Sequence, residues 1–122
     1  MEALRIALQV IIGLGILNVW LLRFGKSSPW RGGEATNMKE EFTAYGLSPT
    51  VMYLVGFLKV LCALLLLAGI WLEILVLPGA LGMTFLMLGA VAMHLKVEDP
   101  PKKSLPAGTL LVLSVAVLLL QF

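Results

Sequence analysis

Long apolar runs alternate with short polar segments along the chain, and this pattern predicts four membrane-spanning helices. A helix that crosses the hydrocarbon core of a bilayer needs about 20 mostly apolar residues, with a range of about 17–25. Four stretches meet this requirement: 3–22, 49–72, 75–96 and 104–121. A cleavable signal peptide is the alternative for the first, but Arg23 follows it without a small-x-small cleavage site. We expect an all-α membrane protein, a single four-helix bundle over 1–122.

Capping and helix-breaking residues mark the expected ends of these helices. Ser48 followed by Pro49 is typical of an N-cap with proline in the first helical turn. The segment 99–101, Asp-Pro-Pro, predicts the end of the third helix. Ser104 is expected to cap the fourth helix.

The loop 23–48 is too long and too structured to be a plain linker. Asn37 followed by Glu40 resembles a capping box, and Gly46 is suited to a helix C-terminus. Three apolar residues at helical spacing share one face: Met38, Phe42 and Tyr45. Three charged residues are expected off that face: Lys39, Glu40 and Glu41. We predict a short amphipathic helix over 37–45 that lies on the membrane or caps the bundle.

Composition supports a membrane protein and excludes other classes. Of the 122 residues, 60% are apolar and 13% are charged, whereas soluble domains average about 45–50% and about 25%. A soluble domain this short could not bury so much apolar surface. The net charge of +2 does not indicate nucleic acid as a partner, so the expected surroundings are a lipid bilayer.

The positive charges are concentrated on one side of the predicted bundle. Both termini share a side with Arg5, while the loops 23–48 and 97–103 lie on the other. Seven lysines and arginines belong to the loop side: Arg23, Lys26, Arg31, Lys39, Lys96, Lys102 and Lys103. The positive-inside rule predicts cytoplasmic loops and external termini in a bacterial-type inner or plasma membrane. The aromatic residues expected at the two interfaces are Trp20, Phe24, Trp30 and Tyr53 on the loop side, and Trp71 and Phe122 on the other.

Lys59 is the charged residue that lies deepest in a predicted span. It follows Pro49 by ten residues, which places it roughly 15 Å into the helix. A charge at that depth costs about 2.5–3.5 kcal/mol on insertion scales and is a functional candidate by default. It could form a buried ion pair with Glu40 or Glu41 that pins the loop, handle a ligand or proton, or simply snorkel.

Two further polar residues, Asn18 and His94, are expected in the same half of the membrane as Lys59. Because each lies on a different helix, they could line one pocket roofed by 37–45, apolar with a few polar anchors. The structural alternatives are an interhelical hydrogen bond for Asn18 and a bond to a helix-end carbonyl for His94. Arg31, which precedes two glycines, could form a simple turn or contact an anion. The candidate ligand-binding residues are Asn18, Arg31, Glu41, Lys59 and His94.

Other sites are not indicated. No catalytic residues are predicted, because no self-contained motif is present. Met83 and Met87 with His94 could suggest Cu(I), but methionines at helical spacing are far more often packing residues, so no metal ligands are predicted. The single Cys62 excludes an intrachain disulfide. Glycines at 79, 82 and 89 form a smooth strip for helix contact, within the bundle or between protomers of a homo-oligomer or larger membrane complex.

Motifs spread over nearly the whole chain carry a family resemblance. They are NVWLLRF at 18–24, WRGG at 30–33, EEF-x-x-YGL at 40–47, GFLK at 56–59, M-x-GA-x-x-MH at 87–94, DP at 99–100 and SLP at 104–106. On these motifs the chain resembles the DoxX-like family of small four-helix membrane proteins. That family is named for a subunit associated with thiosulfate:quinone oxidoreduction, and relatives are linked to membrane redox and thiol-stress complexes. Lys59 departs from the pattern, because many relatives carry a glutamate there.

Three functional hypotheses remain open. The first is a membrane subunit that binds a quinone, or another small lipophilic or anionic molecule, under the first loop. The resemblance implies that any enzymatic activity would be that of a subunit of a membrane oxidoreductase. The second is a non-catalytic accessory or assembly subunit that docks a partner through the Arg31–Glu41 region. The third is a small transporter, which the lack of an acidic residue within the spans disfavours.

Overall fold

Helices account for the fold of this chain. The computed structural model describes residues 1–121, and this part contains no strand. Its α-helices are α1 (Glu2–Leu17), α2 (Met38–Ala44), α3 (Pro49–Ala68), α4 (Val76–Lys96) and α5 (Leu105–Leu119). Three short elements join them: a π-helical turn η1 (Asn18–Leu22) and the 3₁₀ turns η2 (Glu73–Leu75) and η3 (Pro101–Ser104).

Four helical segments within residues 1–121 are long and apolar enough to cross a membrane. They are Glu2–Leu22, Pro49–Ala68, Glu73–Lys96 and Pro101–Leu119. The predicted all-α, four-span architecture is therefore confirmed, and the chain is an integral membrane protein surrounded by lipid. The second span is shorter than the predicted 49–72, because the chain turns at Gly69–Leu72 to enter η2.

The helix starts agree with the expected caps at two places out of three. Ser48 Oγ accepts a hydrogen bond from the Val51 N–H at 3.3 Å, and Asn37 Oδ1 accepts one from the Glu40 N–H at 2.8 Å. Ser104 was wrongly expected to cap α5. It has helical dihedral angles at the end of η3 and makes no capping bond, because an N-cap side chain needs an extended backbone to reach the helix start.

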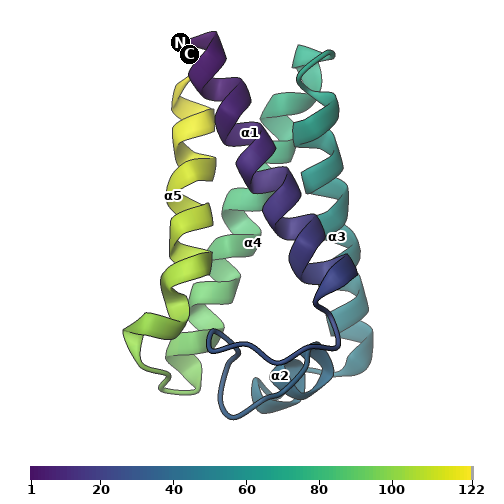
Figure 1. The fold of residues 1–122 in the computed structure, drawn as a ribbon, viewed down its shortest axis with the longest axis vertical. Helices are drawn as coiled ribbons and strands as arrows, with labels where there is room; N and C mark the ends of the chain where they lie inside the picture. The colour runs from purple at the N-terminus through teal and green to yellow at the C-terminus, as the bar shows by residue number, and fades with distance from the viewer. Residues whose placement is uncertain (122) are drawn as a thin grey trace.

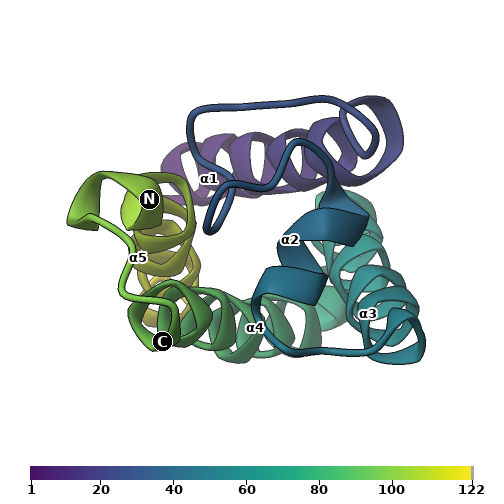
Figure 2. The same ribbon diagram turned by 90° about the horizontal axis from the view of Figure 1, so that it is seen from below.

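The four long helices stand side by side, and α2 lies across one end of them (Figure 1). Both termini are at the opposite end. In the view from below, α2 covers the space between α1, α3 and α4 (Figure 2). The amphipathic segment was expected either to lie on the membrane or to cap the bundle, and in the structure it caps the bundle. Its predicted apolar face is buried, as Met38, Phe42 and Tyr45 all belong to the core.

Small residues and buried polar bonds hold the terminal half of the bundle closed. Gly79 of α4 packs against Leu65 and Leu66 of α3, so this part of the glycine strip makes contacts within the bundle. Gln9 Nε2 donates a hydrogen bond to the Leu66 carbonyl at 2.7 Å. Arg5 pairs with Glu73 at 2.6 Å, which ties α1 to the α3–α4 turn. The helices cannot separate at this end without breaking buried contacts.

Trp20 was wrongly expected at the membrane interface. Its side chain is only 8% exposed and contacts the rings of Phe24 and Phe42, each with a centroid separation of 5.9 Å. It lies directly over Gly56 of α3. Tertiary packing therefore uses Trp20 as a core residue below α2, whereas Trp71 is 80% exposed, as an interface residue would be. Phe122 lies outside the described residues.

Gly56→Ala is expected to destabilise the protein, because the new Cβ would stand 2.4 Å from Trp20 Cζ3. Displacing a buried indole of this size costs about 1–3 kcal/mol. Gly89→Ala is the matched control, since nothing lies within 4 Å of a Cβ there. Thermal unfolding in detergent should show a lower midpoint for Gly56→Ala and an unchanged or raised one for Gly89→Ala. Equal midpoints would contradict the close contact.

Candidate functional site

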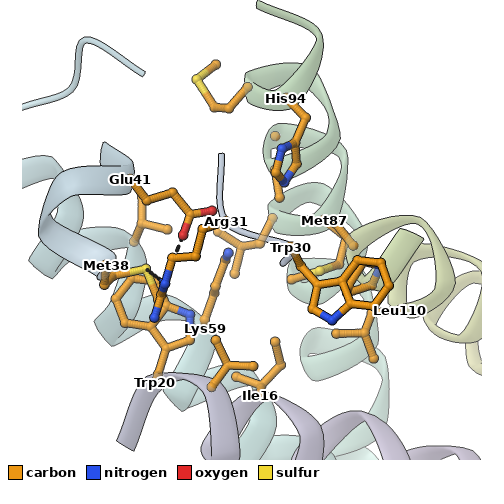
Figure 3. Close-up of a pocket in the computed structure, with 18 of the residues that line it drawn as sticks. Ile16, Trp20, Trp30, Arg31, Met38, Glu41, Lys59, Met87, His94 and Leu110 are labelled. Atoms are coloured by element: carbon orange, nitrogen blue, oxygen red, sulfur yellow. Dashed lines mark hydrogen bonds and ion pairs between the residues drawn. The ribbon is translucent and has the colours of Figure 1, made fainter. Parts of the chain in front are cut away.

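A cavity of about 590 Å³ lies beneath α2, in the half of the bundle opposite the termini. All five residues expected from the sequence line it: Asn18, Arg31, Glu41, Lys59 and His94. Most of the remaining wall is apolar. Figure 3 shows Lys59 and His94 directed into the same space, with Trp30 and Leu110 at its side and Ile16 below.

The close glycine contacts between α3 and α4 end before the cavity begins. Gly82 packs on Cys62 Sγ in the middle of the pair, whereas Gly89, two turns further toward α2, faces open space and lines the cavity. Of the predicted glycine strip, Gly79 and Gly82 therefore make contacts within the bundle and Gly89 does not. The loop and α2 close the wide end, since Tyr45 and Leu47 also line the cavity.

Arg31 is buried and its donors are already used within the chain. Nη1 donates to Glu41 Oε2 at 2.8 Å, and Nη2 donates to the Arg23 carbonyl at 2.7 Å. Nε and Nη2 both reach the Lys26 carbonyl, at 3.1 and 2.9 Å, and Nη1 also reaches Met38 Sδ. A guanidinium has five N–H donors. These contacts account for all of them, so Arg31 organises the loop rather than offering a free anion contact.

Glu41 belongs to the inner face of α2, and the prediction that it lies off that face is wrong. Its carboxylate accepts from Arg31, from the Gly32 N–H at 3.2 Å and from the Tyr45 hydroxyl at 2.8 Å. Burial, and the negative charge of Glu41, raise the pKa of Tyr45 well above its ordinary value. The phenol therefore stays protonated and keeps donating.

Lys59 forms neither of the ion pairs considered from the sequence. Glu41 is bonded to Arg31, and Glu40 accepts instead from the Thr36 N–H and hydroxyl at 2.9 and 2.8 Å. Within residues 1–121 the Lys59 ammonium has no hydrogen-bond partner and no ion pair within 4.0 Å. Its contact with Trp20 is a cation–π interaction, 5.5 Å from the ring centroid. This cation faces an apolar cavity without a counter-charge in contact.

His94 is buried and is held by Asp99, not by a helix-end carbonyl. Its Nδ1 lies 2.7 Å from Asp99 Oδ2, and its ring meets Tyr45 edge-on with centroids 5.8 Å apart. Sequence reasoning missed Asp99, which was interpreted only as a helix breaker. The available signal was its position five residues after the single histidine, just beyond the helix end.

Asp99 also fastens the first loop to the α4–α5 connection. The Gly33 N–H donates to Asp99 Oδ1 at 3.0 Å, and Lys103 Nζ donates to the Gly33 carbonyl. Gly33 has φ +57°, a left-handed conformation that glycine adopts without strain. Burial alone would raise the pKa of Asp99, but hydrogen bonds from His94 and Gly33, with Lys103 nearby, hold it below its ordinary value. The carboxylate is therefore charged at neutral pH.

Asn18 lines the cavity at the start of the π-helical turn. Its backbone carbonyl accepts from the Arg23 N–H at 2.9 Å. Among residues 1–121 its side chain makes no hydrogen bond to another helix, so the interhelical bond considered for it is absent from the described structure.

Comparison with known proteins assigns the family. The family model described as "DoxX-like family" matches residues 16–117, a range that contains all five candidate residues and Asp99. No curated protein matches the chain, and no solved structure does. Because the match covers most of the 122 residues, the protein belongs to the DoxX-like family.

Proposed function

We propose that this DoxX-like membrane protein binds a small lipophilic molecule with an oxygen acceptor, of which a quinone is the best example, in the cavity under α2. The observation that carries the proposal is the Lys59 ammonium, which faces an apolar cavity without a hydrogen-bond or ion-pair partner in the described chain. A charge held in hydrocarbon without a partner is costly. A ligand carbonyl or anionic oxygen would supply the missing acceptor.

The size and lining of the cavity support a ligand of this class. Small-molecule sites are typically about 300–1,000 Å³, mostly apolar, with a few placed polar groups. The volume of about 590 Å³ lies within this range. Trp20, Met87 and Leu110 provide apolar surface for a ring, while Lys59 and His94 provide polar contacts. The ligand would reach the cavity from the surrounding bilayer, which dissolves such molecules.

The charges of the loops also suggest how the protein is oriented in its membrane. We place the α2 end of the bundle on the cytoplasmic side of a bacterial-type inner membrane, because Arg23, Lys26 and Lys39 belong to that end. Quinone binding would link the protein to membrane redox processes, either alone or within a homo-oligomer or larger complex. The accessory role weighed above receives less support, because Arg31 and Glu41 are bonded to each other.

Menadione is expected to quench the tryptophan fluorescence of the protein in nanodiscs in a saturable manner, because Trp20 and Trp30 line the cavity. Trp71 does not line it and is 80% exposed, so the measurement is best made in Trp71→Phe. The comparison ligand is 2-methylnaphthalene, which matches the ring but lacks an acceptor oxygen and should compete weakly. Quenching that rises linearly with the quinone content of the membrane, without saturation, would reject the proposal.

A further inference from the structure

We propose that Asp99 is a positioning residue that holds His94 with its proton on Nδ1, so that the cavity selects ligands that donate a hydroxyl, such as hydroquinones and phenols. This inference rests on the proposed function, because it specifies the ligand class of the same cavity. It assigns opposite tasks to two residues: Lys59 donates a hydrogen bond to the ligand, and His94 accepts one.

The geometry of the pair determines which imidazole nitrogen carries the proton. His94 is 5% exposed and the Asp99 side chain is 5% exposed, and the Nδ1–Oδ2 distance is 2.7 Å. An ionised carboxylate only accepts hydrogen bonds, so Nδ1 must be the donor. A histidine that donates from one nitrogen presents the other as an acceptor when the ring is neutral.

The remaining partners of Asp99 keep it in the accepting state. Both carboxylate oxygens face the Gly33 N–H, at 3.0 and 3.3 Å, and Lys103 Nζ lies 3.8 Å from Oδ1. All of these groups favour the charged carboxylate of Asp99, because a backbone N–H and an ammonium can only donate hydrogen bonds and cannot accept one from a protonated acid. The carboxylate that fastens the loop at Gly33 is therefore also the group that orients His94.

The second ring nitrogen of His94, Nε2, determines which ligands the cavity favours. Within residues 1–121, His94 Nε2 has no hydrogen-bond partner, although the ring is buried and lines the cavity. A quinone offers acceptors only, so it satisfies Lys59 and leaves Nε2 unpaired. A hydroquinone or phenol carries oxygens that both donate and accept, so one such ligand satisfies both residues. A ligand that leaves a polar group of the site unpaired binds less tightly, so the cavity accepts a quinone but prefers the hydroxyl-bearing molecule.

The tautomer is measurable directly because the chain has a single histidine. Protein labelled with ¹⁵N-histidine, in nanodiscs at pH 8, should give the two-bond ¹H–¹⁵N pattern of the Nδ1–H tautomer. In Asp99→Asn, one amide oxygen cannot replace both carboxylate oxygens, so the amide N–H₂ faces Nδ1 and the proton moves to Nε2. An Nε2–H tautomer or a doubly protonated ring in the unmodified protein would overturn the inference.

Ligand selectivity provides the second readout, with 2-naphthol and 2-methoxynaphthalene as redox-inert probes. Calorimetric titration of the protein in nanodiscs, with empty nanodiscs subtracted, should give about five- to tenfold tighter binding of the naphthol. In Asp99→Asn the preference should disappear or reverse. Glu98→Gln is the matched control, since Glu98 is an exposed neighbour and its loss should leave the preference intact.

The outcomes separate this inference from the proposed function. If both probes bind equally well in the unmodified protein, the hydroxyl selectivity is wrong while the cavity remains a binding site. If neither probe nor menadione binds above empty nanodiscs, both proposals fail. If Asp99→Asn does not fold, the tautomer and the selectivity of the unmodified protein still decide the question.

Discussion

Lys59→Met is expected to stabilise the protein against unfolding and to weaken menadione binding at least about tenfold. The stabilisation follows because an ammonium without a described hydrogen-bond or ion-pair partner is replaced by an apolar chain of similar length. The charge costs about 2.5–3.5 kcal/mol at mid-membrane depth. The cation–π contact with Trp20 offsets only part of this, because such contacts contribute about 0.5–2 kcal/mol.

The loss of binding has a separate cause. A hydrogen bond from a charged donor to a ligand oxygen contributes about 1.5–3 kcal/mol, which corresponds to a factor of at least about ten. Stability would be measured by denaturant unfolding in detergent, and binding by the tryptophan quenching described above. Lys39→Met, on the exposed face of α2, is the control and should change neither. A Lys59→Met protein that is less stable than the unmodified one would mean that the ammonium has a structural partner.

Arg31→Met should cause the largest loss of stability among the single substitutions considered. It removes the charged partner of the Glu41 carboxylate and leaves the Lys26 carbonyl without a donor, and the Arg23 carbonyl keeps only the Lys26 N–H. Breaking a buried ion pair from one side costs about 3–5 kcal/mol, because the remaining charge is buried without compensation. We expect the first loop to detach, seen as rapid proteolysis within 23–37 and a large drop in the unfolding midpoint.

Two companion variants show whether geometry or charge is responsible. Arg31→Lys keeps the charge but cannot reach a carboxylate and several carbonyls together, so it should rescue little of the loss. Arg31→Met with Glu41→Gln removes the stranded charge, so its loss should be smaller than that of Arg31→Met alone. Lys26→Met, an exposed change in the same loop, is the control. Unmodified stability in Arg31→Lys would show that the network does not hold the loop.

The helices were predictable because their causes are local. Length and hydropathy alone identify a segment that crosses a bilayer, and the four expected spans are present with small shifts at their ends. The caps at Asn37 and Ser48 were predictable for the same reason, since a cap involves residues within one turn. The convergence of Asn18, Lys59 and His94 followed from their depth, because adjacent helices of one bundle place residues of equal depth close together.

The pairing of charges was not predictable in this way. The helical spacing of the apolar residues placed Glu41 beside the apolar face of α2 and not on it. In the folded chain its carboxylate turns inward, because the buried Arg31 guanidinium lies there. Asp99 follows the end of α4 in a sequence typical of a helix break, and nothing local indicates that it contacts His94 and Gly33. Such contacts depend on the path of a long loop.

Residue order alone was enough to predict the number of spans, the amphipathic character of the α2 segment and the half of the membrane that holds the polar residues. These properties follow from hydropathy, periodicity and depth, which act along one helix at a time. Three outcomes became visible only in the folded chain: Arg31 pairs with Glu41, Asp99 contacts His94, and Lys59 has no hydrogen-bond or ion-pair partner among the described residues. Those outcomes depend on competition among buried charges for a limited set of partners, which is settled only when the loop is folded over the bundle.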